Sequence, residues 1–303
     1  MKFLNEFLYF DELILWAVPV FILSVFLEAA WIIWARKERY PGRDALASIG
    51  MGLGSAVINT GMKSGVMVVF FWLYQHRVWT VPTDTWWGWI LLFLADDFSF
   101  YLHHRACHEI RLFWAGHVNH HSSQHYNLAV ALRQSWGELL HKYIWWAWMP
   151  FWGFHPGAMM VMLSISLIYQ FFLHTESVKH LGWLELILNT PSHHRVHHGS
   201  NIRYLDRNHG GILIIWDKLF GTFTPETEKV QYGITKNIHT YNLWNIATHE
   251  YKALFQDVLR APGWRNKLRY IFYPPGWSHD GSSQTAQELR KAQKSIKAAE
   301  SSP

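Results

Sequence analysis

Eight histidines fall into three short clusters, and each cluster follows a strongly apolar stretch of the chain. The clusters read HRACH, HVNHH and HRVHH, and their histidines are His104, His108, His117, His120, His121, His194, His197 and His198. Imidazole is the commonest metal ligand in proteins. A four-coordinate zinc ion uses four ligands, whereas two redox-active ions with four or five ligands each use the whole set. The clusters therefore predict a dinuclear metal site at the edge of a membrane.

The spacing inside each cluster suits a shared metal. Residues four apart on a helix project from one face, so His104 and His108 converge if their helix continues past the bilayer boundary. In the other two clusters the first histidine stands three and four residues before a pair, which again brings three rings to one side. A single histidine on an apolar helix is more often a hydrogen-bonded core residue. Three such clusters together favour metal binding over that interpretation.

The other histidines and the single cysteine carry weaker signals. His174 closes an apolar stretch and is a candidate ninth ligand, while His103 and His193 precede cluster members and could replace them in register. Cys107 lies off the face shared by its two histidine neighbours and is interpreted as a packing residue. Less certain candidates are His125, His141, His180 and His209. Surface or interface positions are expected for His76, His155, His239, His249 and His279.

The composition indicates an integral membrane protein with one catalytic domain. Of 303 residues, 50% are hydrophobic and only 16% charged, and 19 are tryptophan, which is too apolar for an ordinary soluble domain. The formal charge of +5 does not indicate nucleic-acid binding, because the basic residues flank apolar segments instead of covering one helix or arm.

The apolar segments predict an all-α membrane fold with about four to five transmembrane helices. The basic block after the first segment marks the cytoplasmic side, so the N-terminus lies outside and all three clusters lie in a cytoplasmic histidine-rich cap that holds the metals. The membrane would be the inner membrane of a bacterium or the endoplasmic reticulum of a eukaryote. The expected spans are Leu13–Ala35, Leu46–Tyr74, Trp86–Tyr101, and a helical pair, Glu138–Phe154 and Ala158–His174.

The chain is expected to divide into three parts. Residues 1–75 form the N-terminal transmembrane helices, 84–225 the catalytic domain, and 226–303 a cytoplasmic C-terminal helical region and tail. A rough helical stripe that begins near Leu243 either packs on the domain or lies on the bilayer surface.

The ligand chemistry favours redox-active metal. Thiolates are missing from the set, and nitrogen donors suit iron, copper or zinc. Hydrolytic zinc sites usually include carboxylates, whereas two all-nitrogen sites beside lipid suit iron that activates dioxygen. Ligand imidazoles usually donate their second N–H to an oxygen, and Asp96, Asp97 and Glu109 are candidates to accept it.

The clusters have the spacing HxxxH, HxxHH and HxxHH, and with them the chain resembles the fatty acid hydroxylase and sterol desaturase superfamily of membrane di-iron oxygenases. Most of residues 96–224 share this resemblance, and the stretches NTPSHHRVHH and IIWDKLFGTF are similar to its alkylglycerol monooxygenase branch and bacterial relatives. The resemblance implies that the eight clustered histidines bind two iron ions. Glu109 matches an acidic residue of the family, whereas His209 stands where relatives commonly have tyrosine.

The resemblance also implies a reaction. Relatives hydroxylate a carbon of a lipid or sterol with O2, and the animal enzymes of that branch attack ether lipids with electrons from tetrahydrobiopterin. We therefore expect a lipid hydroxylase in the bilayer with two iron ions, catalytic roles for Glu109 and Asp97, and tetrahydrobiopterin or another external reductant, protein or small molecule, as electron donor. The alternatives are a lipid desaturase on the same site, a zinc-dependent lipid hydrolase, and a metal-binding membrane protein without catalysis.

Overall fold

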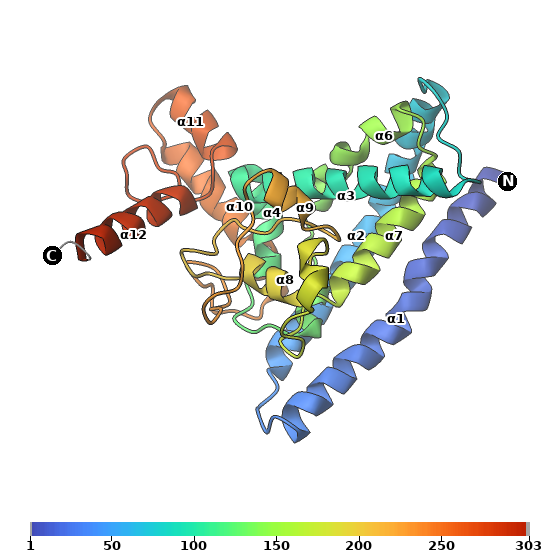
Figure 1. Ribbon diagram of the computed structural model, residues 1–303. Helices are drawn as coiled ribbons and strands as arrows, with labels where there is room; N and C mark the ends of the chain where they lie inside the picture. The colour runs from blue at the N-terminus through green and yellow to red at the C-terminus, as the bar shows by residue number, and fades with distance from the viewer. Residues whose placement is uncertain (1, 301–303) are drawn as a thin grey trace.

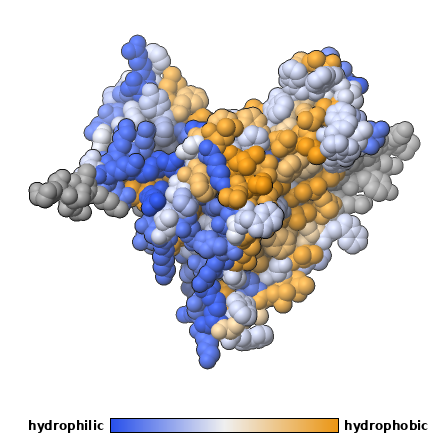
Figure 2. Space-filling view, in the orientation of Figure 1, coloured by the Kyte–Doolittle hydropathy of each residue, from blue (hydrophilic) through white to orange (hydrophobic). Residues whose placement is uncertain are grey.

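The computed structural model describes residues 2–300, and within that range the chain is helical, with no strand beyond two isolated bridges. Two long helices, α1 (Lys2–Trp34) and α2 (Gly42–Gln75), run beside α7 (Pro156–Phe171), and α3 (Trp86–Glu109) crosses them obliquely (Figure 1). These four helices form the apolar half of the molecule, which Figure 2 shows in orange. The all-α prediction is confirmed for the described residues.

Two helical segments are long and apolar enough to cross a membrane, Trp16–Trp34 within α1 and the whole of α2. Only 28% and 11% of their most apolar windows are buried, so most of their apolar side chains face outward. Val57, for example, is 76% exposed. Helices that are apolar on every side and uncovered by protein are typical of lipid contact. The expected third and fifth spans coincide with α3 and α7, which fall outside this pair of segments.

The expected helix over Glu138–Phe154 is wrong. The chain there breaks into α5 (Leu139–Lys142), the 3-10 turn η2 (Tyr143–Trp146) and α6 (Trp148–Phe151). The Trp146 side chain is fully buried, and its indole N–H donates to Asp96 on α3 at 2.7 Å. The aromatic run thus reflects burial against α3, and Pro150 lacks the N–H that a continuous helix would need. The turn at His155-Pro156 does begin α7, with proline in the first helical turn.

Two acidic side chains anchor the long helices to the interior. Glu28 of α1 is 8% exposed and accepts the backbone N–H of Leu128 at 2.6 Å and the hydroxyl of Thr175. Asp44 of α2 pairs with Arg133, whose side chain is 1% exposed. Buried charges are stable only when paired, so these contacts fix both helices to the turn η1 (Leu128–Leu132) and to the segment after α7.

The other half of the molecule is more polar and is built from shorter helices. The helix α10 packs on α4, with Leu254 beside Leu112, and Arg111 at the start of α4 pairs with Glu250 and Asp257 of α10. The buried Ile246 and Ala247 of α10 pack against α2. The stripe that begins near Leu243 therefore packs on the domain in part, because Phe255 and Leu259 stay exposed. The helices of this half are α4 (Arg111–His121), α8 (Pro191–His197), α9 (Ile215–Leu219), α10 (Leu243–Arg260), α11 (Gly263–Phe272) and α12 (Ala286–Glu300), with the 3-10 turn η3 (Gly182–Leu186).

Candidate metal centre

All eight clustered histidines and His174 meet where the two halves of the molecule join. The helix α3 continues to Glu109, well past its apolar segment, and carries two of them one turn apart. Three come from the end of α4, three from α8 and its last turn, and His174 follows α7. Pro191 stands in the first turn of α8 and sets that short helix in place. None of the nine is more than 9% exposed.

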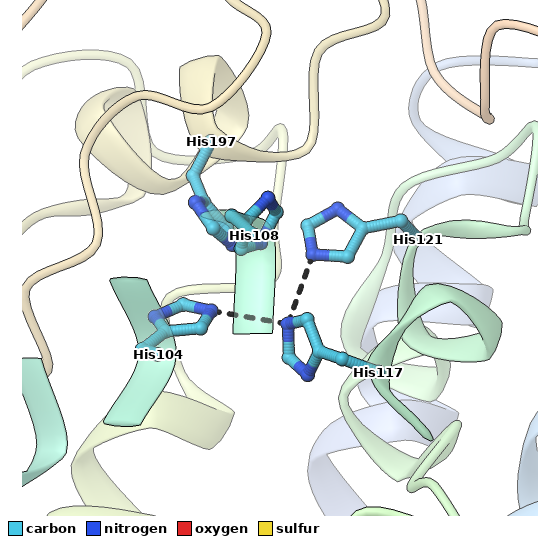
Figure 3. A group of neighbouring side chains, drawn as sticks. All are labelled: His104, His108, His117, His121 and His197. Carbon is cyan, nitrogen blue, oxygen red and sulfur yellow. Dashed lines mark hydrogen bonds between the residues drawn. The ribbon is translucent and has the colours of Figure 1, made fainter. Parts of the chain in front are cut away.

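Five of these residues form one group, in which one nitrogen of each ring lies within 4.8 Å of the others. This five-histidine group consists of His104, His108, His117, His121 and His197. Figure 3 shows the rings pointing toward a common centre. The Nε2 atom of His117 lies 3.2 Å from the Nε2 atoms of both His104 and His121.

The remaining four residues form a second group with the same close spacing. This four-histidine group consists of His120, His174, His194 and His198. The Nε2 atom of His174 lies 3.2 Å from that of His120 and 3.1 Å from that of His194. The two groups adjoin, because the rings of His121 and His198, one from each group, stack with centroids 4.4 Å apart.

These donors fit two metal ions. At metal–nitrogen distances of about 2.1 Å, neighbouring ligand atoms lie about 3 Å apart, which is the spacing seen here. The buried Nε2 atoms of His108, His197 and His198 have no hydrogen-bond partner. A proton between two rings satisfies only one pair of nitrogens, whereas a cation at the centre of each group accepts every lone pair at once.

Hydrogen bonds on the far side of the rings orient the lone pairs toward each centre. In the five-histidine group, the Nδ1 atom of His117 donates to Glu138 at 2.8 Å and that of His108 to Asp206 at 3.2 Å. Because these oxygens only accept, Nδ1 carries the proton and Nε2 presents its lone pair. Four further rings donate Nδ1 to a backbone carbonyl: His104 to His209, His197 to Arg207, His120 to Arg133 and His174 to Gln170.

Burial disfavours the charged form of His197 and His198. It lowers the pKa of both rings well below the usual value, and neighbouring rings lower them further, His104 and His121 for His197 and His121 and His120 for His198. Neutral imidazole is the form that binds metal. At neutral pH the groups are therefore assembled in their ligating state.

The two carboxylates expected to be catalytic lie outside both groups. Asp97 is fully buried and accepts the backbone N–H groups of Ile212 and Leu213 and the indole N–H of Trp216. Its contacts hold the loop that begins at His209. The Glu109 side chain is 47% exposed and pairs with Arg105 on the same helix at 2.8 Å.

Sequence reasoning missed the two carboxylates that do contact ligand rings. Glu138 stands at the start of a segment that was expected to be a span, and the break of that helix is what turns its side chain toward His117. Asp206 lies in a loop and has positive φ, so neither periodicity nor cluster spacing indicated it. Asp206 follows the third cluster by eight residues, so a search for acids close to the clusters would have found it, whereas Glu138 lies 17 residues after His121.

His103 lies in neither histidine group. With Cys107 and His141 it forms a separate small group beside Glu138, whose carboxylate is 3.5 Å from the His103 Nε2 atom. Cys107 is fully buried, with its sulfur 3.5 Å from the same nitrogen. These residues therefore pack behind His117, on the far side of Glu138 from the five-histidine group.

The other histidines have separate places. His209 is fully buried beside the five-histidine group, with its ring centroid 5.1 Å from that of His108, and neither of its ring nitrogens has a hydrogen-bond partner. His193 packs against Phe223, and the half-exposed His180 pairs with Glu185. The remaining ones lie outside both groups: His76, His125, His155, His239, His249 and His279.

Comparison with known proteins is consistent with this centre. The family model Fatty acid hydroxylase matches residues 89–222, a range that contains all nine histidines, Glu138 and Asp206. No solved structure matches the chain significantly.

Several characterised proteins are similar over most of the chain. Human alkylglycerol monooxygenase is 42% identical over 264 residues, which cover 86% of this chain and 59% of the relative. The Caenorhabditis elegans alkylglycerol monooxygenase is 36% identical over 84% of this chain and 53% of the relative. Ornithine lipid hydroxylase OlsE of Rhizobium tropici is 29% identical over 65% of this chain and 58% of the relative. The chain spans about six tenths or less of the length of these relatives. The chain thus contains a region that matches the fatty acid hydroxylase model, and it is similar to alkylglycerol monooxygenases over most of its length.

Proposed function

We propose that the chain is a membrane lipid hydroxylase with two iron ions, one in each histidine group. The observation that carries the proposal is the division of nine buried histidines into adjoining groups of five and four. Each group has enough nitrogen donors for one ion. Neither contains the carboxylates or thiolates that hydrolytic or structural zinc sites commonly use.

The iron pair would supply the oxidising power, by activating O2 for attack on an unactivated C–H bond. The protein residues would hold the metal ions and orient the rings that bind them. The nine rings would present ring nitrogens to the two ions, and Glu138 and Asp206 hold His117 and His108 in the tautomer whose Nε2 carries the lone pair. Burial of every ring excludes bulk water from the metals.

The substrate we propose is a lipid that approaches from the bilayer. Two of the relatives described above are named for lipid substrates, an alkylglycerol and an ornithine lipid. Two helices connect the apolar half of the molecule with the histidine groups (Figure 1). The helix α3 contains His104 and His108, and His174 follows the end of α7. We place α1 and α2 across the membrane, with the histidines on its cytoplasmic side.

Asp97 and Glu109 have positioning roles in this proposal. Asp97 holds the loop whose His209 carbonyl accepts the Nδ1 proton of His104, so it acts on the metal through a ligand. Glu109 with Arg105 stabilises the last turn of α3 below His108. Electrons come from outside the chain, from a separate protein or a small reductant, with tetrahydrobiopterin as one compound to test.

The decisive experiment compares lipid extracts from aerobic, iron-supplied cells with and without the full chain. The expected result is a lipid that gains one oxygen atom, and isotope-labelled dioxygen should supply that atom. The matched control is His198→Ala, which lacks a ligand of the four-histidine group. A lipid that loses two hydrogens instead would identify a desaturase, and turnover without O2 or reductant would identify a hydrolase. Either outcome overturns the hydroxylase proposal.

A further inference from the structure

The helix α11 has an uncovered apolar stripe. Trp264, Leu268 and Phe272 stand one turn apart and are 67%, 44% and 55% exposed. Residues four apart share one face of a helix. The opposite side of α11 packs on the domain, where Tyr270 is buried against Leu254 of α10. One helix thus has a face that packs on the domain and a second apolar face that the rest of the chain leaves open.

Basic side chains border this open stripe. At 100° per residue, Arg265 falls on one side of the stripe and Lys267 on the other, with Arg269 next to Arg265. The helix sequence, GWRNKLRYIF, contains no acidic residue. Tryptophan, leucine and phenylalanine on one face with basic residues at its margins are typical of helices that lie in the headgroup region of a bilayer.

The position of α11 in the fold supports the same interpretation. The backbone N–H of Arg111 donates to the carbonyl of Tyr273 at 3.0 Å, and this tie fixes the end of α11 beside the point where α3 ends and α4 begins. The lobe that holds α11 is hydrophilic on its outer side and has an apolar side that faces the apolar half of the molecule (Figure 2). This lobe therefore presents apolar surface toward the long apolar helices.

We infer that α11 lies in the bilayer interface on the side of the histidines, with its apolar stripe among the acyl chains and its basic margins on anionic lipid headgroups. The inference rests on the proposed membrane insertion of α1 and α2. The charge of α11 favours a membrane with anionic lipids. The helix carries three basic residues and no acidic residue, which complements a negatively charged surface. The C-terminal region thus uses α10 to pack on the domain and α11 to contact the membrane.

Cysteine labelling of the full chain tests this placement. The only native cysteine, Cys107, is fully buried, so a polarity-sensitive fluorophore reports on introduced sites. The test site is L268C, the span control is V57C on α2, and the water control is Q287C at an exposed polar position of α12. Each variant is reconstituted into phosphatidylcholine vesicles with or without phosphatidylglycerol. The wild-type chain measures background labelling.

The expected result is that the probe at L268C is quenched by lipid-borne nitroxide and is about fivefold less accessible to iodide than the probe at Q287C. The protection should be greater in vesicles with phosphatidylglycerol. Adding Arg265→Gln and Lys267→Gln should remove that difference, and an unchanged difference would overturn headgroup recognition by these residues.

Equal iodide quenching at L268C and Q287C, with V57C still in lipid, would overturn the inference and leave the proposed hydroxylase untouched. Iodide access at V57C would instead show that α2 does not insert, which overturns the membrane placement and the inference with it. Protection of L268C that requires an added protein would identify a protein docking surface and would also refute lipid contact.

Discussion

The two histidine groups adjoin, yet different parts of the molecule hold them. The five-histidine group is supported by two carboxylates, Glu138 and Asp206, and by carbonyls of the loop that contains Arg207 and His209. The rings of the four-histidine group donate to backbone carbonyls instead, those of Arg133 and Gln170.

A residue that supplies one of these carbonyls, and the neighbour of one ring, are bonded to the long helices α2 and α1, respectively. Asp44 of α2 pairs with Arg133, and Glu28 of α1 accepts from Thr175, the neighbour of His174. The five-histidine group is thus supported by charge, and the four-histidine group is positioned by the two long helices. Carboxylate partners make ligand imidazoles more basic. We therefore expect the two sites to respond differently to substitutions of their supports.

Loss of a ligand should give the largest effect. His197→Ala in the five-histidine group and His194→Ala in the four-histidine group should each lower lipid hydroxylation by at least ~100-fold, because the loss of a ligand exceeds the usual cost of losing its hydrogen-bond partner. Elemental analysis should show one iron per chain instead of two in each variant. The control is His180→Ala at an exposed position. Two retained ions in both variants would contradict separate groups of five and four.

Substitution of Asp44 should act on the four-histidine group. Asp44→Ala leaves the buried Arg133 without its partner, which typically costs about 3–5 kcal/mol of stability. The melting temperature should fall, and the remaining folded protein should lose iron from the four-histidine group first. Asp206→Asn is the matched variant, and it should deplete the other group with little loss of melting temperature. The same order of iron loss in both variants would refute the difference in support.

Substitution of Glu138 should act on the five-histidine group. Glu138→Gln removes the charge that faces the Nδ1 atom of His117, and iron affinity there should fall by about 10–100-fold. The matched control is Gln170→Ala, which keeps the backbone carbonyl that His174 uses and should leave iron affinity unchanged. Titration with a competing chelator measures both. Equal affinities in the two variants would mean that the carboxylate does not tune the site.

A lower pH should destabilise both histidine groups of the metal-free protein, because rings in both groups are buried. Burial lowers the pKa of His197 and of His198, so below about pH 6.5 the unfolded chain binds protons that the folded metal-free chain excludes. The free energy of unfolding of the metal-free protein therefore falls as the pH drops through this range. Thermal unfolding of chelated protein at about pH 8 and about pH 5.5 measures it. A melting temperature that rises toward acid would contradict neutral, buried rings.

The smallest effect is expected at His209. Its ring lies beside the five-histidine group without a hydrogen bond, so His209→Phe should retain both irons and change hydroxylation by less than about threefold. Loss of one iron in this variant would make His209 a sixth ligand of that group.

The sequence predicts the ligands more completely than their grouping. Helical spacing indicates that His104 and His108 share a face, and they do belong to one group. Neighbours on a helix point about 100° apart, and His120 and His121 accordingly go to different groups. That division depends on where α8 and the end of α7 approach α4, which is tertiary packing and leaves no periodic signal.

The same limit applies to the fold. The length of their apolar segments predicts α1 and α2. Most of the apolar side chains in these segments are not covered by the rest of the chain, so the pattern does not depend on tertiary packing. The segment around Trp146 has a similar composition, but Trp146 itself is fully buried and bonded to Asp96 of α3. Burial in protein and exposure to lipid leave the same apolar pattern, so the sequence could not separate them.

The contact between Glu28 and its partners bears on how the chain is made. Leu128 is synthesised 100 residues after Glu28, and Thr175 is synthesised 147 residues after it. During translation α1 is therefore complete before either hydrogen-bond partner of its Glu28 carboxyl group has been made. Assembly beside His174 can finish only when the later segment emerges from the ribosome, so the four-histidine group should be a late step of biogenesis.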